Sequence, residues 1–207
     1  MGFEAGGTRS IAGVIALIIW VGLAVQFSAV IGQNGSVTET IWVLLRYFTI
    51  TTNLLAAVAL TGIALGKPVF GSPTLLGGLT MSMVFVGLIY VLFLRGLLEL
   101  SGGAELANFI LHYVDPVFVL LFWLAFAPKG TLRNSDPLIW VIYPLAYGVY
   151  AVARGAVDGK YAYPFIDVAQ IGWLKATINI LLLAVAFLVA GFVMVWLDRI
   201  LGRRKSS

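Results

Sequence analysis

Cysteine is absent from this 207-residue chain, and histidine occurs only once. Without cysteine the chain can form no disulfide bond, no thiolate nucleophile and no thiolate-bound metal site. The single histidine, His112, has one acidic residue close by, Asp115, and these two groups do not make a plausible zinc site. The sequence therefore predicts no metal ion and no other cofactor.

Charged residues are also scarce, at 11% of the chain, whereas a soluble domain carries about 25%. Hydrophobic residues make up 61%, and the mean hydropathy is +1.02. A chain of this composition could not cover a globular surface with polar groups, so lipid must be the solvent for most of it. The net charge of +4 would suit an acidic partner, but the basic residues form no nucleic-acid-binding face, so we expect no nucleic-acid partner. We therefore expect membrane lipids to surround the protein.

Six apolar runs follow one another, separated by short segments rich in glycine, proline, asparagine and serine. A bilayer core of about 30 Å needs about 20 apolar residues per helix. The sequence thus predicts an all-α, polytopic membrane protein, with residues 1–207 forming a single integral membrane domain built as a bundle of six transmembrane helices. The expected spans are 11–31, 41–65, 74–94, 106–126, 137–153 and 176–197. The first run is too long for the apolar part of a signal peptide, so we interpret it as a retained helix.

The lysine and arginine residues predict the orientation of these spans. If the N-terminus is inside, eight of them fall on inside segments and four on outside segments, while Arg46 lies within the second span. The inside residues are Arg9, Lys67, Lys129, Arg133, Arg199, Arg203, Arg204 and Lys205, and the outside residues are Arg95, Arg154, Lys160 and Lys175. Because basic residues concentrate on the cytoplasmic side, we expect both termini there.

Two of the expected spans contain polar residues at helical spacing. Within each span these residues are three and four positions apart, so each set shares one helix face. Lipid does not tolerate such groups, and both faces should therefore point into the bundle. The residues are Arg46, Thr49 and Asn53 in the second span, and Asn108, His112 and Asp115 in the fourth.

Thr49 and His112 are expected at similar depths in the outer half of the bundle. A helical rise of 1.5 Å per residue places Thr49 about 12 Å, and His112 about 9 Å, from the outer ends of their spans. A hydroxyl beside a neutral imidazole is what nucleophilic acyl transfer needs, because the ring can take the hydroxyl proton. Thr51 and Thr52 remain alternative nucleophiles, although threonines in membrane helices more often bond to a carbonyl one turn earlier.

Polar neighbours could assist such a pair. Asp115 or Asn108 could orient the imidazole ring, as in catalytic triads. Arg46 could bind a carboxylate or stabilise an oxyanion. Asn53 and Asn108 also suit the commoner role of hydrogen bonding between helices.

The segment before the last span is aromatic, with Tyr161, Tyr163 and Phe165 placed around Pro164. Such a segment can be an aromatic belt at the membrane interface, which its composition alone favours. It can also fold back as a lid over a cavity. The sequence fits both an aromatic belt and a lid.

Three short patches resemble one known family, that of the androgen-induced protein and the androgen-dependent TFPI-regulating protein, together with its bacterial membrane homologues. Residues 46–49 are similar to the family's basic–aromatic–apolar–Thr run, which carries its nucleophile. Residues 108–112 have the family's Asn four positions before the catalytic His, with Pro116 close behind. Residues 163–167 resemble its Tyr-Pro-Phe-apolar-acidic motif. The chain lacks the second histidine that some members carry, and no acidic residue follows Thr49 as in the vertebrate members.

The resemblance implies an intramembrane hydrolase of lipid esters, such as fatty acid esters of hydroxy fatty acids, in a bacterial cytoplasmic membrane. It implies that Thr49 is the nucleophile and His112 the base. It also implies that Tyr163, Pro164, Phe165 and Asp167 line the mouth of the cavity. The same polar cluster fits a non-enzymatic lipid carrier or sensor that binds a headgroup or an ion, and the sequence predicts no oligomeric state.

Overall fold

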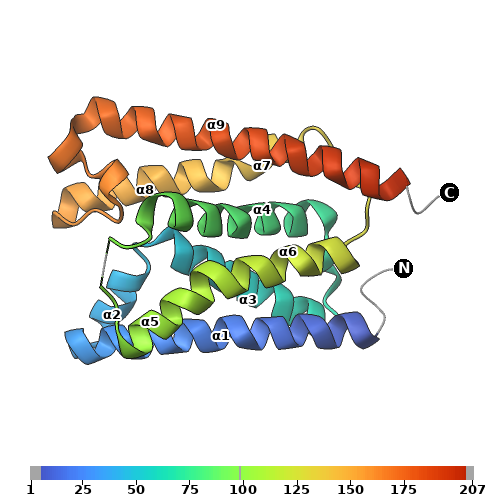
Figure 1. Ribbon diagram of the computed structural model, residues 1–207, viewed down its shortest axis with the longest axis horizontal. Coiled ribbons are helices and arrows are strands. Elements are labelled where there is room, and N and C mark those ends of the chain that lie inside the picture. Colours follow the sequence, from blue (N-terminus) through green and yellow to red (C-terminus); the bar gives the residue numbers. More distant parts are fainter. Residues whose placement is uncertain (1–5, 98, 204–207) are drawn as a thin grey trace.

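The computed structural model describes residues 6–97 and 99–203, which form an elongated helical bundle with no strand among them (Figure 1). Short 3-10 turns (η1, η4) and π-helical turns (η2, η3) interrupt the α-helices. The elements are α1 (Gly6–Asn34), α2 (Val37–Leu44), α3 (Phe48–Ala64), η1 (Pro68–Gly71), α4 (Pro73–Ile89), η2 (Tyr90–Leu94), α5 (Gly102–Phe109), η3 (Ile110–Val114), α6 (Asp115–Phe126), α7 (Asp136–Trp140), α8 (Ile142–Asp158), η4 (Pro164–Ile166) and α9 (Val168–Arg203).

Five helical segments are long and apolar enough to cross a membrane, and a bent pair of helices makes a sixth if it counts as one span. The segments are Gly6–Gln33, Pro73–Leu94, Gly102–Phe126, Asp136–Asp158 and Val168–Arg203. The bent pair is α2 with α3, and it bends by 98°. The predicted all-helical, membrane-spanning character is therefore confirmed, whereas the prediction of one continuous helix over 41–65 is wrong.

Arg154 and Arg46 do not lie where the sequence predicts them. Arg154, counted as a loop residue, lies inside α8 with a buried side chain. Arg46, assigned to the interior of the second helix, lies instead in the non-helical break between α2 and α3. Arg204 and Lys205 lie outside the described residues.

The outer faces of the bundle are apolar, and many of its polar groups are buried. Leu17, Val149 and Leu182 are 64%, 72% and 61% exposed, while the side chains of Asn53 and Asp115 are fully buried. A soluble protein shows the reverse arrangement. Lipid around the helices is therefore the solvent that this surface requires.

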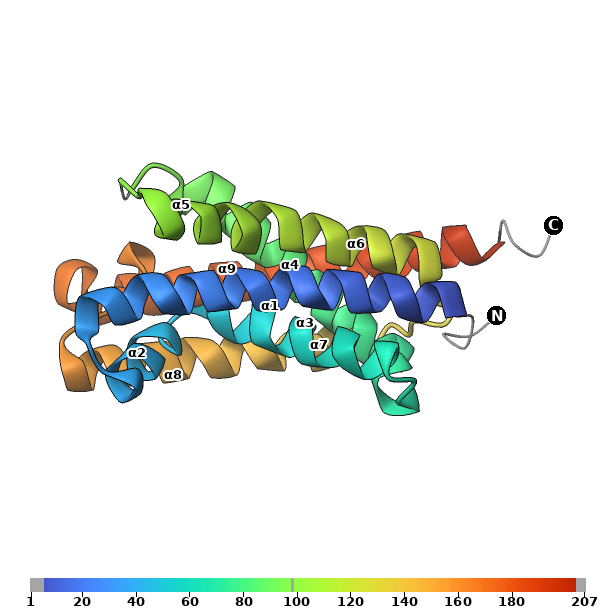
Figure 2. The ribbon, with the colours of Figure 1, turned by 90° about the horizontal axis from the view of Figure 1, so that it is seen from below.

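The helices at the centre of the bundle are α3 and α4. Helix α1 packs along α3 and α5, and α4 packs against α3, α6 and α9 (Figures 1 and 2). The start of α1 and the end of α9 lie at one end of the bundle (Figure 1). The bend between α2 and α3, both π turns and the loop before α9 lie toward the other end, and this arrangement positions the site described below.

Side chains of α8 hold the bend between α2 and α3. A broken helix leaves backbone carbonyls without N–H partners, which is costly in a membrane. Three donors on one face of α8 satisfy carbonyls at the bend. The pairs are Tyr147 with the Arg46 carbonyl at 2.6 Å, Tyr150 with the Leu45 carbonyl at 3.1 Å, and Arg154 with the Trp42 carbonyl. Helix α8 therefore fixes the geometry of the bent pair α2 and α3.

Candidate active site

Thr49 lies in the first turn of α3, directly after the bend. Tyr47 caps this helix in an extended conformation, so α3 begins inside the protein and its first N–H groups have no helical acceptor. The Thr49 side chain is buried, and its Oγ1 lies 3.1 Å from Nε2 of His112. The structure thus brings together the two residues that the sequence singled out for acyl transfer.

The imidazole of His112 is fixed by three contacts. Its Nδ1 lies 3.1 Å from the backbone carbonyl of Asn108, and its ring stacks on Tyr90 with centroids 4.1 Å apart. Because a carbonyl can only accept, Nδ1 carries the ring hydrogen and Nε2 presents a lone pair. The Thr49 hydroxyl therefore donates to Nε2, which is the arrangement in which imidazole can act as a base.

Asn108 orients the ring through its main chain, not through the side chain that the sequence suggested. Its side-chain nitrogen instead donates to the Tyr90 hydroxyl at 2.6 Å. Tyr90, which the sequence did not single out, therefore stacks on the imidazole and also binds the side chain of Asn108, whose carbonyl holds Nδ1. Its only sequence signal is a tyrosine near the end of an apolar run.

A π-helical turn places His112 at this position. The N–H of Asp115 bonds to the carbonyl of Ile110, five residues back, which leaves the Leu111 carbonyl without its usual α-helical donor. Pro116 has no N–H to offer in its place. The Asn53 side chain donates to the Leu111 carbonyl at 3.3 Å and to the Thr49 carbonyl at 2.8 Å. Asn53 therefore ties the helix of Thr49 to the helix of His112, which is the interhelical role expected of it.

Asp115 does not bond the ring of His112, and Arg46 binds the carboxylate of another residue of the chain. Asp115 is fully buried on α6, and neither of its carboxyl oxygens has a hydrogen-bond partner among the described residues. The ring nitrogens of His112 are bonded elsewhere, so Asp115 does not orient the ring. Arg46 is off the α3 face because the helix is broken there. Its guanidinium forms an ion pair with Asp158 at 2.6 Å.

Thr51 and Thr52, the alternative nucleophiles, face away from His112. Both hydroxyls lie 3.0 Å from the hydroxyl of Tyr143, and Thr51 also donates to the Phe48 carbonyl at 3.1 Å. Among these three threonines, only Thr49 contacts the imidazole in the structure. Thr49 is therefore the threonine that the structure places beside His112.

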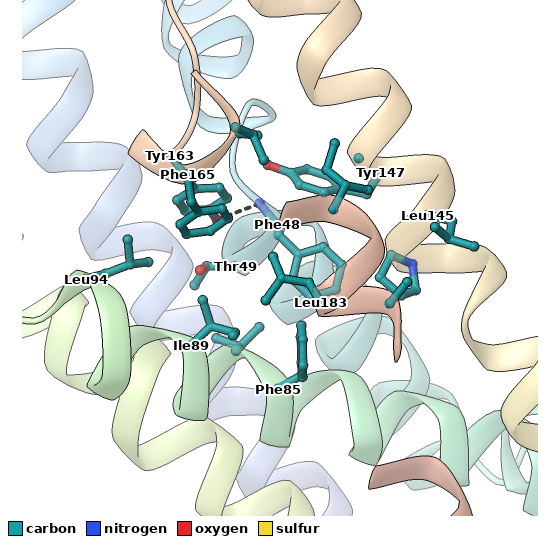
Figure 3. A pocket seen from close by; sticks show the side chains of 16 residues that line it. Phe48, Thr49, Phe85, Ile89, Leu94, Leu145, Tyr147, Tyr163, Phe165 and Leu183 are labelled. Carbon is teal, nitrogen blue, oxygen red and sulfur yellow. Dashed lines mark hydrogen bonds between the residues drawn. The ribbon is translucent and has the colours of Figure 1, made fainter. Parts of the chain in front are cut away.

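An apolar cavity of about 70 Å³ opens beside Thr49 (Figure 3). Its walls come from α3, α4, α8, α9 and the loop before α9. The residues that line it include Thr49, Phe85, Tyr147, Tyr163, Phe165 and Ala184. An apolar lining with a few polar groups is typical of pockets that hold hydrophobic ligands. The arrangement places the Thr49 hydroxyl at the wall of an apolar space.

Some residues of the loop before α9 line the cavity and others do not. Tyr163 and Phe165 line the cavity, with their rings stacked at 5.2 Å, as a lid requires and a purely interfacial belt does not. Pro164 is exposed and begins the 3-10 turn η4. Asp167 accepts hydrogen bonds from the N–H groups of Ala169 and Gln170, so it caps the start of α9. Pro164 and Asp167 are therefore not among the residues that line the cavity.

Acidic, histidine and cysteine side chains do not gather into a candidate metal site anywhere in residues 6–97 and 99–203. The chemistry available at the site is therefore that of its hydroxyl groups, one imidazole and the backbone N–H groups at the start of α3. Comparison of the chain with family models gives no match, and comparisons with curated proteins and with solved structures give none either.

Proposed function

We propose that the protein hydrolyses lipid esters within the membrane, with Thr49 as nucleophile and His112 as general base. The observation that carries the proposal is the 3.1 Å contact between Thr49 Oγ1 and His112 Nε2, in a ring whose Nδ1 is bonded to a carbonyl. A threonine hydroxyl is a weak nucleophile until a base removes its proton. The fixed tautomer supplies that base at hydrogen-bonding distance.

The reaction proceeds in two half-reactions. Thr49 Oγ1 attacks the ester carbonyl carbon while its proton passes to His112 Nε2, and the carbonyl electron pair moves to oxygen. The tetrahedral intermediate then expels the alcohol, which takes the proton from Nε2, and an acyl-threonine remains. A water molecule next gives its proton to Nε2 and attacks this acyl group, releasing the carboxylic acid and restoring the Thr49 hydroxyl.

The cavity supports a substrate with a long hydrocarbon chain, because Thr49 is among the few polar groups on an otherwise apolar wall. Fatty acid esters of hydroxy fatty acids, the substrates that the three sequence patches imply, have such chains. We further propose that the chain belongs to that family, with six spans and both termini in the cytoplasm of a bacterium. The site then lies in the outer half of the membrane, and the ester reaches it from the lipid.

A non-enzymatic lipid carrier or sensor is the second candidate, and the apolar cavity itself favours it. A carrier needs the cavity but no activated hydroxyl. Loss of the Thr49 hydroxyl should therefore abolish hydrolysis if the protein is an enzyme, and should leave lipid binding intact if it is a carrier.

Covalent labelling of the purified protein tests the enzymatic proposal. An alkyl fluorophosphonate reacts with hydroxyl groups that a neighbouring base activates, so we expect the label on Thr49, located by peptide mass spectrometry. Thr51→Ala is the matched control, because it removes a hydroxyl two residues away, and it should label like the parent protein. Labelling that survives Thr49→Ala, or that does not depend on His112, contradicts the proposal.

A second prediction concerns Asn108, whose carbonyl and not its side chain holds the ring. Asn108→Ala keeps that carbonyl and loses only the hydrogen bond to Tyr90. Since one such bond contributes about 1 kcal/mol, kcat for p-nitrophenyl palmitate should fall by about tenfold or less. Tyr90→Phe breaks the same bond from the other side and should have the same effect. A loss as large as that of His112→Ala would mean that the amide itself orients the imidazole.

A further inference from the structure

The hydroxyl of Tyr163 lies at the start of α3, beside the nucleophile. The N–H of Phe48, the residue before Thr49, donates to this oxygen at 3.1 Å (Figure 3). The phenol also interacts with the side chain and the backbone of Thr49 itself. A loop residue more than a hundred positions away in sequence is thus held next to the hydroxyl that attacks the substrate.

Ring contacts hold the phenol in this position. Phe165 stacks on Tyr163 with an interplanar angle of 7°, and Tyr47 meets it edge-on at 6.1 Å. Both rings of the stack belong to the cavity wall. The hydroxyl is therefore directed at the same space that receives the ester, and little reorganisation is needed to use it.

The side-chain neighbours that this hydroxyl has for its hydrogen are themselves hydroxyl groups, those of Thr49 and Tyr147. Phe48 supplies the hydrogen in its bond to Tyr163, and the neighbouring Tyr147 hydroxyl donates to the Arg46 carbonyl. Within the part of the chain that the structure describes, no carbonyl or carboxylate accepts from Tyr163. Burial raises the pKa of the phenol above its ordinary value, so the hydroxyl keeps its proton at neutral pH.

We propose that Tyr163 is a catalytic residue that donates its hydrogen bond to the oxyanion formed when Thr49 attacks the ester carbonyl. This inference rests on the hydrolase function proposed above. The Thr49 hydroxyl gives its own hydrogen to His112, so its oxygen can face Tyr163 as it attacks. The carbonyl oxygen then gains its negative charge within reach of the phenol, which donates without losing its proton. No proton is transferred to or from Tyr163 in either half-reaction.

This role uses the bond from Phe48 as well. A hydroxyl that accepts a hydrogen bond becomes a better donor, because the two bonds polarise each other. In a cavity without bulk water, one donor aimed at a developing charge is worth about 10²–10³-fold in kcat. Binding of the uncharged ground-state ester gains little from it, so KM should depend on the donor only weakly.

Hydrolysis of p-nitrophenyl palmitate by the purified protein in detergent tests the proposal. Tyr163→Phe removes one oxygen and keeps the stacked ring, and we expect kcat to fall by about 10²–10³-fold with KM changed by less than about threefold. Tyr161→Phe is the matched control. It makes the same change in the same loop, where the ring packs on Gly155, and should leave kcat unaltered.

Inhibitor binding distinguishes a loss of oxyanion stabilisation in Tyr163→Phe from a loss of packing. A long-chain alkyl boronic acid, which becomes a charged tetrahedral adduct on Thr49, should bind Tyr163→Phe more weakly by the factor lost in kcat/KM. Palmitic acid, which forms no adduct, should bind both proteins equally. If Tyr163→Phe unfolds more readily, a fluorinated tyrosine at position 163 replaces it. Its more acidic phenol should move the alkaline limb of the pH–rate profile to lower pH, which a structural role would not do.

The outcomes distinguish this inference from the proposed function. If Thr49→Ala hydrolyses the ester as fast as the parent protein, the hydrolase proposal itself fails. If Thr49→Ala is inactive while Tyr163→Phe keeps kcat within about threefold, the hydrolase stands and the oxyanion role of Tyr163 is overturned. An increase in kcat also overturns it, because the hydroxyl would then be obstructing the site.

Discussion

Thr49→Ala is expected to lower kcat for p-nitrophenyl palmitate by about a thousandfold or more, and His112→Ala to lower it by a similar factor. Each variant removes one half of the pair that lies 3.1 Å apart. Without the base the hydroxyl keeps its proton, and without the hydroxyl the base has no nucleophile to activate.

The double variant decides whether the two residues act as a unit. Residues of one catalytic pair give strongly non-additive losses, so Thr49→Ala with His112→Ala should cost little more than either change alone. Initial rates at saturating ester give kcat for all three proteins. Losses that multiply would mean that the residues act separately and that the pair is not the catalytic device.

Matched variants guard against an effect on folding. Thr52→Ala removes a buried hydroxyl one turn from Thr49, one that is bonded to Tyr143 and not to His112, and should keep hydrolysis near the parent level. Thr49→Ser restores a hydroxyl on the same backbone and should recover a measurable part of the rate. Equal losses in Thr52→Ala and Thr49→Ala would show that the cavity was disturbed, not the nucleophile.

Arg154→Met is expected to be the most destabilising single change at the bend between α2 and α3. The guanidinium donates to the Trp42 carbonyl and to the Tyr150 hydroxyl, and it lies 3.9 Å above the Trp42 ring. Its side chain is 3% exposed, so the carbonyl left behind gains no water in exchange. Losing a charged donor to a buried carbonyl costs about 2–3 kcal/mol in the free energy of unfolding.

Unfolding in mixed micelles, followed by circular dichroism, measures this loss. Lys175→Met makes the same change of charge at an exposed position of α9 and should leave the unfolding transition in place. Because the bend sets the start of α3, Arg154→Met should also lose ester hydrolysis at a lower temperature than the parent protein. A variant as stable as the Lys175→Met control would show that α8 does not hold the bend.

Helical spacing predicted the candidate pair but not the contacts around it. Thr49 and His112 could be selected because each sits at an inward position of an apolar run, where a polar group needs a partner. Arg46 fits the same spacing, yet it lies in the break and pairs with Asp158. Spacing assumes a continuous helix, and the side chains of α8 that stabilise the break come from another span far along the chain.

Helical spacing also fails to predict which group orients the imidazole of His112. Asp115 is one turn from His112 in an ideal helix, and this spacing predicts a hydrogen bond between its carboxylate and the imidazole. The π turn over Ile110–Val114 instead gives the ring the Asn108 carbonyl, which no side-chain pattern encodes. Tyr90 reaches the ring because α4 packs against α6, and that packing is not visible in the sequence.

Composition and periodicity by themselves determined that this chain is a bundle of apolar, membrane-spanning helices with polar faces turned inward. Those properties depend on local hydrophobicity and on the 3.6-residue helical repeat, and both are read directly from the order of residues. Only the tertiary structure decided that the helix expected over 41–65 is broken, that Asn108 holds the ring through its backbone, and that the Tyr163 hydroxyl lies beside Thr49. Each of these depends on hydrogen bonds between distant segments, and such bonds are decided by how the helices pack, not by the order of residues within any one of them.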